Sequence, residues 1–221
     1  MKDNIIIKQI PVGPFQVMTY LVACPQTREA VIIDPAGEED RLLDLINTEG
    51  LNVKYILNTH GHADHVLGNC KLKDELNVPV CMHEADDRFF SEAAVRETSS
   101  RELGLPPPDP ADIRLKDGDI IEVGTLTIES IHTPGHTPGS VCYLVGGNLF
   151  SGDTLFVGAA GRTDLIGGSL DTLLDSIEKR LIVLPGETII WPGHDYGESQ
   201  TSTMAREMVE NPYITDFILD E

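Results

Sequence analysis

The sequence predicts an α/β fold of four layers, in which two β-sheets pack face to face and helices cover their outer sides. Each half of the 221-residue chain holds short β-type runs together with segments of helical periodicity. No linker, repeat or low-complexity segment interrupts the chain. Because each sheet must bury an apolar face against another layer, two such halves are expected to stack sheet on sheet. We therefore expect residues 1–221 to form a single domain.

The first half is expected to alternate strands with helices. Leu42, Leu45 and Ile46 recur at helical spacing, in a segment whose first turn is acidic. Prolines at positions 106, 107, 108 and 110 rule out regular structure over residues 98–112. The expected strands are Ile5–Ile10, Tyr20–Cys24, Ala30–Asp34, Val53–Asn58 and Val78–Met82, and the expected helices are Glu38–Glu49, Val66–Leu76 and Glu84–Val95.

The second half repeats this alternation. The dipeptide Gly146-Gly147 separates two apolar runs, which is a hairpin signal. Ser169 is placed to cap a helix that continues through Arg180 with leucines on one face. The expected strands are Asp119–Val123, Leu126–His132, Val141–Val145, Asn148–Ser151 and Thr188–Trp191, and the last expected helix is Glu198–Val209.

Composition excludes several classes of function. With 16 basic against 36 acidic residues the formal net charge is −20, a field that repels nucleic acids. No apolar run approaches the roughly 20 residues needed to cross a bilayer, and the N-terminus shows no signal-peptide pattern. Cys24, Cys70, Cys81 and Cys142 are widely spaced, so buried, reduced thiols are expected. We expect a cytoplasmic protein without nucleic-acid or membrane partners, and the sequence leaves its oligomeric state open.

The most informative segment is the octapeptide Asn-Thr-His-Gly-His-Ala-Asp-His at residues 58–65, directly after an expected strand. It brings His60, His62, Asp64 and His65 onto one short loop. Neutral imidazoles and a carboxylate are ligands for Zn²⁺, Fe²⁺ or Mn²⁺, whereas a structural zinc site usually contains Cys. Four potential ligands are more than one ion can take from a single short segment. The spacing therefore predicts two ions side by side, the alternative being a histidine-rich surface loop.

Three later residues support a metal-binding active site. His136, Asp153 and His194 each follow the end of an expected strand by a few positions, where the active loops of such folds lie. Each is directly preceded by a glycine, which lets the backbone turn tightly enough to aim the side chain inward. A single pair of this kind is more often an ordinary turn. Together with the octapeptide, the three predict one composite site.

These motifs resemble the metallo-β-lactamase superfamily, from about residue 5 to residue 210. The family pattern is His-x-His-x-Asp-His followed by a distant His, an Asp and a final His, and every position is filled here. The resemblance implies an αββα sandwich of two mixed β-sheets. It also implies two divalent metal ions, zinc first, with iron or manganese as alternatives. One ion would be held by His60, His62 and His136 and the other by Asp64, His65 and His194, with Asp153 bridging the two.

The implied site predicts hydrolysis. Two cations sharing Asp153 would bind a bridging water and lower its pKa, which gives a hydroxide nucleophile at neutral pH. They would also polarise a substrate carbonyl and stabilise the tetrahedral intermediate. Asp64 is expected to orient the hydroxide or to pass a proton to the leaving group. Asp64 and Asp153 are therefore the candidate catalytic residues.

Within the superfamily the chain is most similar to the glyoxalase II group, which hydrolyses thioesters such as hydroxyacylglutathione. Asp153 in Ser-Gly-Asp-Thr, and His instead of Cys at the second metal, match that group. Members of the group carry a C-terminal helical domain whose basic residues hold glutathione. Here only residues 195–221 follow His194, and they contain one Arg and no Lys. We expect a small-molecule thioester as substrate, with glutathione-derived and other thiols both open.

Persulfide dioxygenases give an alternative reaction on the same fold, and the Gly-Arg-Thr-Asp stretch at residues 161–164 is similar to theirs. In that group a single Fe is held by the equivalents of His60, His136 and Asp153, a two-His-one-carboxylate face with open positions for substrate and O₂. Both groups retain the same ligand positions, so ligand spacing does not separate them. An antibiotic-hydrolysing lactamase fits less well, because neither an export signal nor a Cys ligand is evident.

Four residues outside the ligand pattern also have expected roles. Arg162 and Tyr196 are expected to contact substrate, the alternatives being a salt bridge to Asp164 and a packing aromatic. His132, at a strand end, is expected to pack or to hydrogen-bond behind the ligands. His83 is expected to lie at a helix entry.

Overall fold

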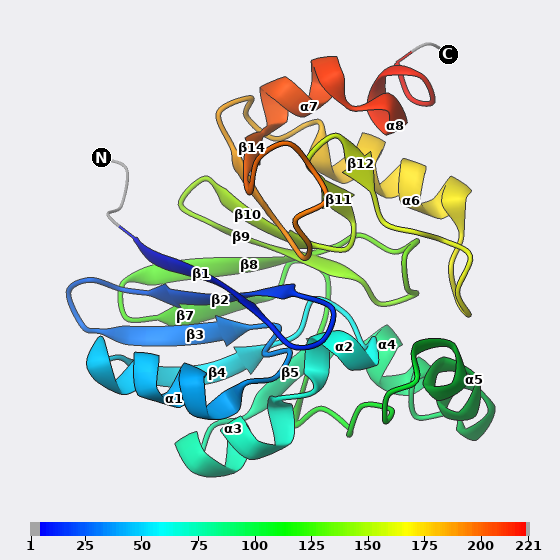
Figure 1. Ribbon diagram of the computed structural model, residues 1–221. Helices are drawn as coiled ribbons and strands as arrows, with labels where there is room; N and C mark the ends of the chain where they lie inside the picture. The colour runs from blue at the N-terminus through cyan, green and yellow to red at the C-terminus, as the bar shows by residue number, and fades with distance from the viewer. Residues whose placement is uncertain (1–4, 220–221) are drawn as a thin grey trace.

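The structure is a computed structural model that describes residues 5–219, and it has the four-layer αββα arrangement that the sequence predicts (Figure 1). The single-domain prediction for residues 1–221 includes positions 1–4 and 220–221, which lie outside the described residues. The N-terminal sheet has six strands in chain order: β1 (Ile6–Val12), β2 (Val17–Ala23), β3 (Glu29–Ile33), β4 (Asn52–Leu57), β5 (Val80–His83) and β6 (Ile113–Leu115). Strands β1 to β3 are antiparallel and β3 to β6 are parallel.

The C-terminal sheet is also mixed. Its six strands lie in the order β14 (Ser202–Thr203), β13 (Ile189–Pro192), β10 (Asn148–Gly152), β9 (Val141–Val145), β8 (Leu126–His132) and β7 (Ile120–Val123). The pair β10–β13 is parallel and the other neighbours are antiparallel. A small separate hairpin follows β10 and consists of β11 (Leu155–Phe156) and β12 (Ala159–Ala160).

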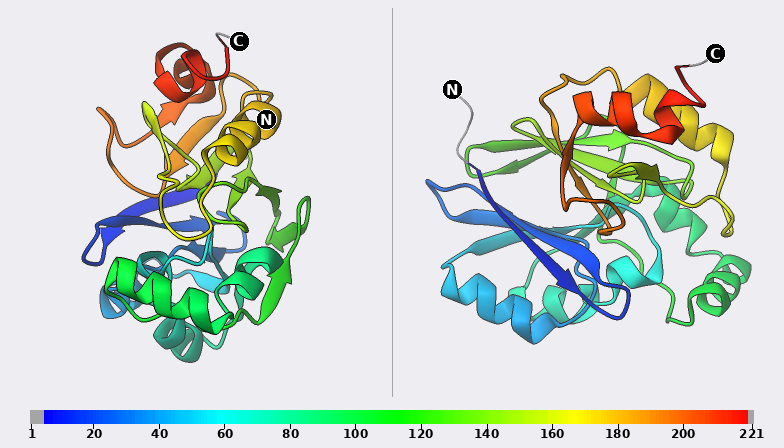
Figure 2. Two further views of the ribbon diagram at one scale, coloured as in Figure 1. Left: turned by 90° about the vertical axis from the view of Figure 1, so that its right-hand side faces the viewer. Right: turned by 45° about the horizontal axis from the view of Figure 1, so that its top comes forward.

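Three apolar clusters correspond to the three interfaces between the four layers. Between the sheets lie Tyr20, Leu57, Tyr143 and Phe150 with their neighbours. Helices α1 (Glu39–Thr48) and α3 (Asn69–Leu76) cover the N-terminal sheet through Leu42, Ile46 and Leu72. The C-terminal sheet is covered through Leu173, Ile177, Met204 and Ile214 by α6 (Leu170–Ser176), a π-helical turn (Ile177–Leu181), α7 (Met204–Glu210) and α8 (Pro212–Thr215). The rotated views show these helices on the two outer sides (Figure 2).

Most predicted strands and the helix over Glu38–Glu49 are confirmed to within a few residues, and the Ser169 side chain caps α6 by accepting from the Thr172 amide. The helix predicted over Val66–Leu76 is confirmed as α3, which begins at Asn69, and the short helix α2 (Ala63–Val66) lies before it. Between them the Gly68 amide donates to the Pro35 carbonyl at 2.7 Å. The single helix predicted over Glu84–Val95 is wrong, because two helices occupy that region, α4 (Glu84–Phe89) and α5 (Ala93–Leu103).

The irregular structure predicted for residues 98–112 is wrong up to Leu103, because α5 continues until Gly104 ends it at a φ of 68°. The strand β6 was not predicted, since only three residues form it. The helix predicted over Glu198–Val209 begins only at Met204, after Thr203 has paired with β13. Cys70 is exposed, contrary to the expectation of buried thiols, whereas the other three cysteines are buried and free.

Strand direction places the candidate residues at one edge of the sandwich. The parallel strands β3, β4 and β5 end at the same edge of their sheet. In the other sheet, β8, β10 and β13 run in a common direction. The loops that follow these strands hold the predicted site. Within residues 5–219 no helix is long and apolar enough to cross a membrane.

Candidate metal centre

The octapeptide of residues 58–65 carries the chain from β4 into α2. His60 and His62 lie on the loop, whereas Asp64 and His65 lie in the short helix. All four side chains are buried. Imidazoles and carboxylates are seldom buried without partners, so their surroundings decide what the site does.

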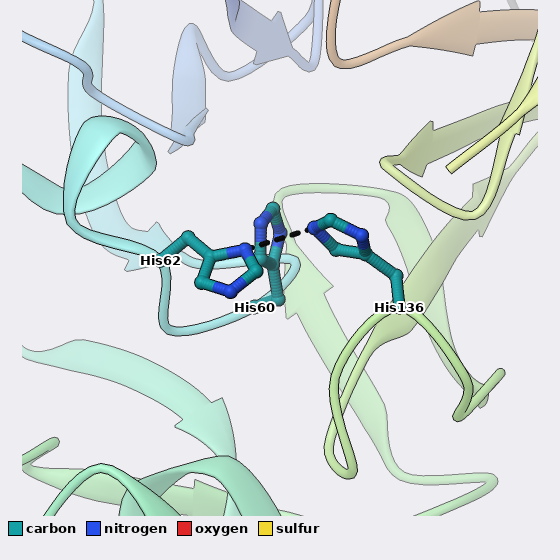
Figure 3. Close-up of side chains that lie close together, drawn as sticks. All are labelled: His60, His62 and His136. Atoms are coloured by element: carbon teal, nitrogen blue, oxygen red, sulfur yellow. Dashed lines mark hydrogen bonds between the residues drawn. The ribbon is translucent and has the colours of Figure 1, made fainter. Parts of the chain in front are cut away.

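The first group consists of His60, His62 and His136, whose imidazoles face one another (Figure 3). His62 Nδ1 lies 2.9 Å from His136 Nε2. The centroid of the His60 ring lies 4.9 Å from that of His62 and 4.7 Å from that of His136. His136 lies on the loop between β8 and β9, so the group joins loops from the two sheets. Three converging imidazole nitrogens form a typical site for a divalent transition metal.

The second group consists of Asp64, His65 and His194. His65 Nε2 lies 3.3 Å from His194 Nε2, and Asp64 Oδ2 lies 3.8 Å from each of these nitrogens. His194 follows β13, so this group also draws on both sheets. A carboxylate with two imidazoles is again a typical donor set for a divalent transition metal.

Asp153 lies between the two groups. Its Oδ1 is 3.4 Å from His65 Nε2, and its Oδ2 is 3.6 Å from His136 Nε2 and 3.5 Å from His194 Nε2. Gly193 makes this approach possible, because a Cβ at that position would lie 2.3 Å from Asp153 Oδ1. The structure thus brings all seven predicted ligands together.

The donor atoms of this cluster are incompletely paired. His60 Nε2, His62 Nε2 and Asp153 Oδ1 are buried and have no hydrogen-bond partner within residues 5–219. A buried polar atom without a partner costs about 1–3 kcal/mol, and native proteins hold few of them. Several such atoms at one place fit a site that holds cations.

Burial lowers the pKa of His60 and His62 well below the ordinary value, and it lowers the pKa of His136 as well. Burial, together with the charge of His65, lowers the pKa of His194 to about 4. These imidazoles are therefore neutral near pH 7. The neutral form is the one that binds metals, so the residues fit the donor chemistry of a metal site.

His65 differs from the other histidines. Burial disfavours its charged form, but the carboxylates of Asp153, Asp64 and Asp34 outweigh burial and raise its pKa to about 10. Asp34 Oδ2 accepts from His65 Nδ1 at 3.0 Å, which leaves Nε2 facing the second group. A carboxylate behind an imidazole fixes the ring and its tautomer in metal sites.

Asp34 also holds the loop of the octapeptide. Its Oδ1 accepts from the Thr59 amide at 2.7 Å and its Oδ2 from the Thr59 hydroxyl at 2.6 Å. The side chain is buried, and the backbone of Asp34 is in the left-handed region with a φ of 47°. Such a conformation is unfavourable for most L-residues, and Asp and Asn tolerate it best.

Comparison with known proteins decides the family. The sequence pattern of the Metallo-beta-lactamase superfamily matches residues 12–194. The chain belongs to this superfamily. Members of this superfamily share the fold described above, and the solved structure of BLEG-1 B3 metallo-beta-lactamase superimposes with a TM-score of 0.86 at 38% identity, covering 95% of this chain and 100% of that one.

The relatives of this superfamily member carry different activities. The hydroxyacylglutathione hydrolase GloC of Haemophilus influenzae is 35% identical over 213 residues, which is 94% of this chain and 97% of that protein. The human mitochondrial persulfide dioxygenase ETHE1 is 36% identical over 200 residues, 89% of this chain and 71% of that protein. The structure of TTHA1623 in a di-iron-bound form has a TM-score of 0.79 at 37% identity, covering 93% and 99% of the two chains.

The two predicted substrate contacts lie beside the ligand cluster. The backbone carbonyl of Arg162 accepts from His136 Nδ1 at 2.7 Å. The guanidinium of Arg162 donates two hydrogen bonds of 2.7 Å to the Asp164 carboxylate. The salt bridge considered as an alternative is therefore present. The Tyr196 ring stacks on the His194 ring with centroids 5.0 Å apart, and 68% of Tyr196 is exposed. A substrate role for either residue stays a prediction.

The histidines outside the ligand pattern have other partners. His83 begins α4 as predicted, and its Nδ1 accepts from the Ala85 amide at 3.3 Å. The rings of His83 and His132 stack with centroids 4.0 Å apart. His132 Nε2 donates to the Pro138 carbonyl at 2.9 Å. The expectation that His132 packs or hydrogen-bonds behind the ligand loop is thus confirmed.

Sequence reasoning missed two carboxylates that contact the ligand loops, Asp34 and Asp86. Asp34 had a usable signal, because it follows a buried strand as the predicted ligands do. Asp86 had none. It lies in the first turn of α4, where an acidic residue is ordinary because it opposes the helix dipole.

Proposed function

We propose that this superfamily member is a metal-dependent hydrolase that cleaves thioesters with two divalent metal ions. The observation that carries the proposal is the position of the Asp153 carboxylate, whose oxygens lie 3.4–3.6 Å from imidazole nitrogens of both groups. A carboxylate in that position suits a shared ligand between two cations. The relative whose solved structure is a di-iron-bound form supports the same number of ions.

The proposed ligands of one ion are His60, His62 and His136, and those of the other are Asp64, His65 and His194, with Asp153 common to both. Imidazole and carboxylate donors suit zinc, and they suit iron and manganese too. We propose zinc first, with iron and manganese as alternatives.

When bound, two divalent ions supply a lowered pKa for water and polarise a carbonyl. The residues of the chain supply position and proton transfer. Asp64 accepts a proton from the attacking water and passes it to the departing thiolate as the C–S bond breaks. The acyl group leaves as a carboxylic acid and the sulfur leaves as a thiol, so the overall reaction is hydrolysis of the thioester.

The substrate is proposed to approach past Tyr196 and Arg162. Tyr196 stacks on the ring of His194, and Arg162 accepts from His136 through its backbone carbonyl, so each residue borders one of the two groups. A glutathione-derived thioester is the first substrate to test, because a relative named hydroxyacylglutathione hydrolase is matched over 97% of its own length.

The second candidate function is that of a persulfide dioxygenase. The 36% identity to human ETHE1 favours it. In that case a single Fe would be held by His60, His136 and Asp153. His60 and His136 belong to the first group, and Asp153 Oδ2 lies 3.6 Å from His136 Nε2. The second group would then have no ion to hold.

We also propose a cytoplasmic location. Cys24, Cys81 and Cys142 are buried free thiols, and Cys70 is an exposed free thiol. Unpaired cysteines are typical of reducing compartments. Fractionation of cells that produce the chain would test this, and recovery outside the cytoplasm would contradict it.

The experiment that separates the two reactions combines metal content with two matched variants. Protein purified without chelators is analysed for metal and assayed for hydroxyacylglutathione hydrolysis and for persulfide-dependent oxygen uptake. In the hydrolase, the wild type holds about two ions, and His60→Ala and His194→Ala both abolish hydrolysis. In the dioxygenase, the wild type holds about one iron, and only His60→Ala abolishes oxygen uptake.

His132→Asn serves as the control, because His132 ends β8 and its ring contacts the Pro138 carbonyl and the His83 ring. Hydrolysis that survives loss of His194 would overturn the two-ion proposal. A β-lactam is included as a third substrate, because the BLEG-1 structure is that of a B3 metallo-beta-lactamase.

A further inference from the structure

We propose that Asp86 is a positioning residue for the metal centre, a buried carboxylate that ties together the two loops carrying His60, His62 and His136. This inference rests on the proposed metal centre and not on which of the two reactions occurs there. The two loops leave different sheets, so their relative position depends on contacts between them.

The Asp86 carboxylate contacts both loops. Its Oδ2 accepts from the Gly61 amide at 2.8 Å and from the Thr137 hydroxyl at 2.7 Å. Its Oδ1 accepts from the Gly139 amide at 2.6 Å. Gly61 lies between His60 and His62 in the chain, and Thr137 directly follows His136. Each ligand of the first group is therefore covalently adjacent to a residue that donates to Asp86.

Packing supports the same link. A Cβ on Gly139 would lie 2.3 Å from the Asp86 amide nitrogen, so that loop presses directly on α4. A Cβ on Gly61 would lie 2.3 Å from the ring of Phe90, one helical turn after Asp86. The Phe90 ring also meets the His62 ring edge-on, with centroids 5.7 Å apart. Asp86 and Phe90 thus present one surface to the ligand loops.

The charge of Asp86 is compensated by these donors. Asp86 is fully buried, and among residues 5–219 it takes part in no salt bridge. Burial raises its pKa to about 6, and the bonds from Thr137, Gly61 and Gly139 oppose that rise, so it remains a carboxylate near pH 7. Both oxygens are needed as acceptors, because each faces a backbone N–H.

Replacing Asp86 by the isosteric Asn therefore changes the hydrogen bonds to the ligand loops without changing the side-chain shape. In Asp86→Asn the side chain keeps its shape, but its NH₂ must face an amide N–H in either orientation. Either the Gly61 amide or the Gly139 amide then loses its acceptor. His62 Nδ1 and His136 Nε2 lie only 2.9 Å apart, so a small shift between the loops changes the ligand geometry. Replacement of groups that orient ligands typically costs 10–100-fold in metal affinity.

Asp87→Asn is the matched control. Asp87 is the next residue of α4 and is also buried, but it accepts from Arg114 Nε at 2.6 Å and from the Ala111 amide at 2.8 Å. These partners lie away from the ligand loops in the chain. Both variants are expected to lose folding stability, whereas only one is expected to lose metal affinity.

The experiment is a titration of the metal-free protein with Zn²⁺ against a competing chelator, with urea unfolding of the same samples. We expect Asp86→Asn to weaken one of the two binding steps by about 10–100-fold, with wild-type affinity in the Asp87→Asn variant. Wild-type affinity in Asp86→Asn, or an equal loss in Asp87→Asn, would overturn the inference. A wild type that binds no Zn²⁺ would overturn the metal centre itself.

A second variant keeps the inference testable where Asp86→Asn does not fold. Thr137→Val preserves the side-chain shape and removes one donor to Asp86, while the bonds from Gly61 and Gly139 remain. A several-fold loss of Zn²⁺ affinity in one step is expected. Unchanged affinity in a folded Thr137→Val would count against the role assigned to Asp86.

Discussion

Asp34→Asn is expected to disable one ligand of the second group without disturbing the fold. Asp34 Oδ1 accepts from the Thr59 amide, so the oxygen of the new Asn stays there. Its NH₂ then faces the Thr59 hydroxyl and His65 Nδ1. The hydroxyl accepts by rotating, but Nδ1 accepts only when the imidazole proton moves to Nε2. That nitrogen faces Asp153 and His194, so a proton on it blocks metal binding.

The expected loss of metal affinity in Asp34→Asn follows from the hydrogen bonds that change. The backbone cost is small, because Asn tolerates the left-handed conformation of residue 34 as well as Asp does. Loss of a hydrogen bond to a charged group costs about 1.5–3 kcal/mol. Loss of the group that orients a metal-binding His typically costs 10–100-fold in affinity, or about 1.4–2.8 kcal/mol. The loss is expected at the ion held by His65, with the His60, His62 and His136 group retaining its affinity.

The assay is stepwise Zn²⁺ binding by chelator competition, with turnover measured on the same samples. Wild-type affinity in both binding steps would refute the tautomer argument. Equal weakening of both steps would also refute it, because it would indicate general damage to the site. Asp112→Asn is the control, since Asp112 accepts from the Val80 amide far from the ligand cluster in the chain.

Three further predictions follow from the same geometry. His60→Ala and Asp153→Ala are each expected to abolish turnover by removing ligands, and full activity of Asp153→Ala in steady-state assays would contradict its bridging position. Gly193→Ala is also expected to abolish turnover, because the new Cβ would lie 2.3 Å from Asp153 Oδ1 and displace that carboxylate. Metal analysis of the variant would detect the lost ions. Burial and the neighbouring His132 lower the pKa of His83 to about 4. Between about pH 6.5 and pH 4 the unfolded chain therefore binds a proton at this residue that the folded chain does not bind. The free energy of unfolding is expected to fall as the pH drops through this range. His83→Asn is expected to keep turnover and to remove up to about 3 kcal/mol of that pH dependence in urea titrations, and an unchanged slope would contradict this assignment.

The ligand residues could be predicted because their signal is local. His60, His62, Asp64 and His65 share one loop, and the remaining ligands each follow a buried strand and a glycine. Strand ends of the same direction meet at one edge of a sheet, so such residues converge whenever the sheets stack. The layers were predictable for a similar reason, since strands and helices differ in their apolar periodicity.

The supporting residues could not be predicted, because their partners are distant in the chain. Asp86 accepts from residues 25, 51 and 53 positions away. Nothing near Asp86 in the sequence separates it from Asp87, which has a different partner. The late start of α3 has the same origin. The helix α2 does not continue into α3 because the Gly68 amide donates to the Pro35 carbonyl, a contact made only in the folded chain.

The contacts behind the second group bear on the choice between the two reactions. A mononuclear dioxygenase needs the His60, His136 and Asp153 donors alone. In this chain His65 is held by a buried carboxylate whose backbone has a φ of 47°, a conformation that costs of order 1 kcal/mol for an L-residue. The contact directs His65 Nε2 toward Asp153, Asp64 and His194. Because Asp34 also accepts from Thr59, directly before His60, the same carboxylate supports ligands of both groups, and the number of ions that the protein binds is the measurement that separates the two reactions.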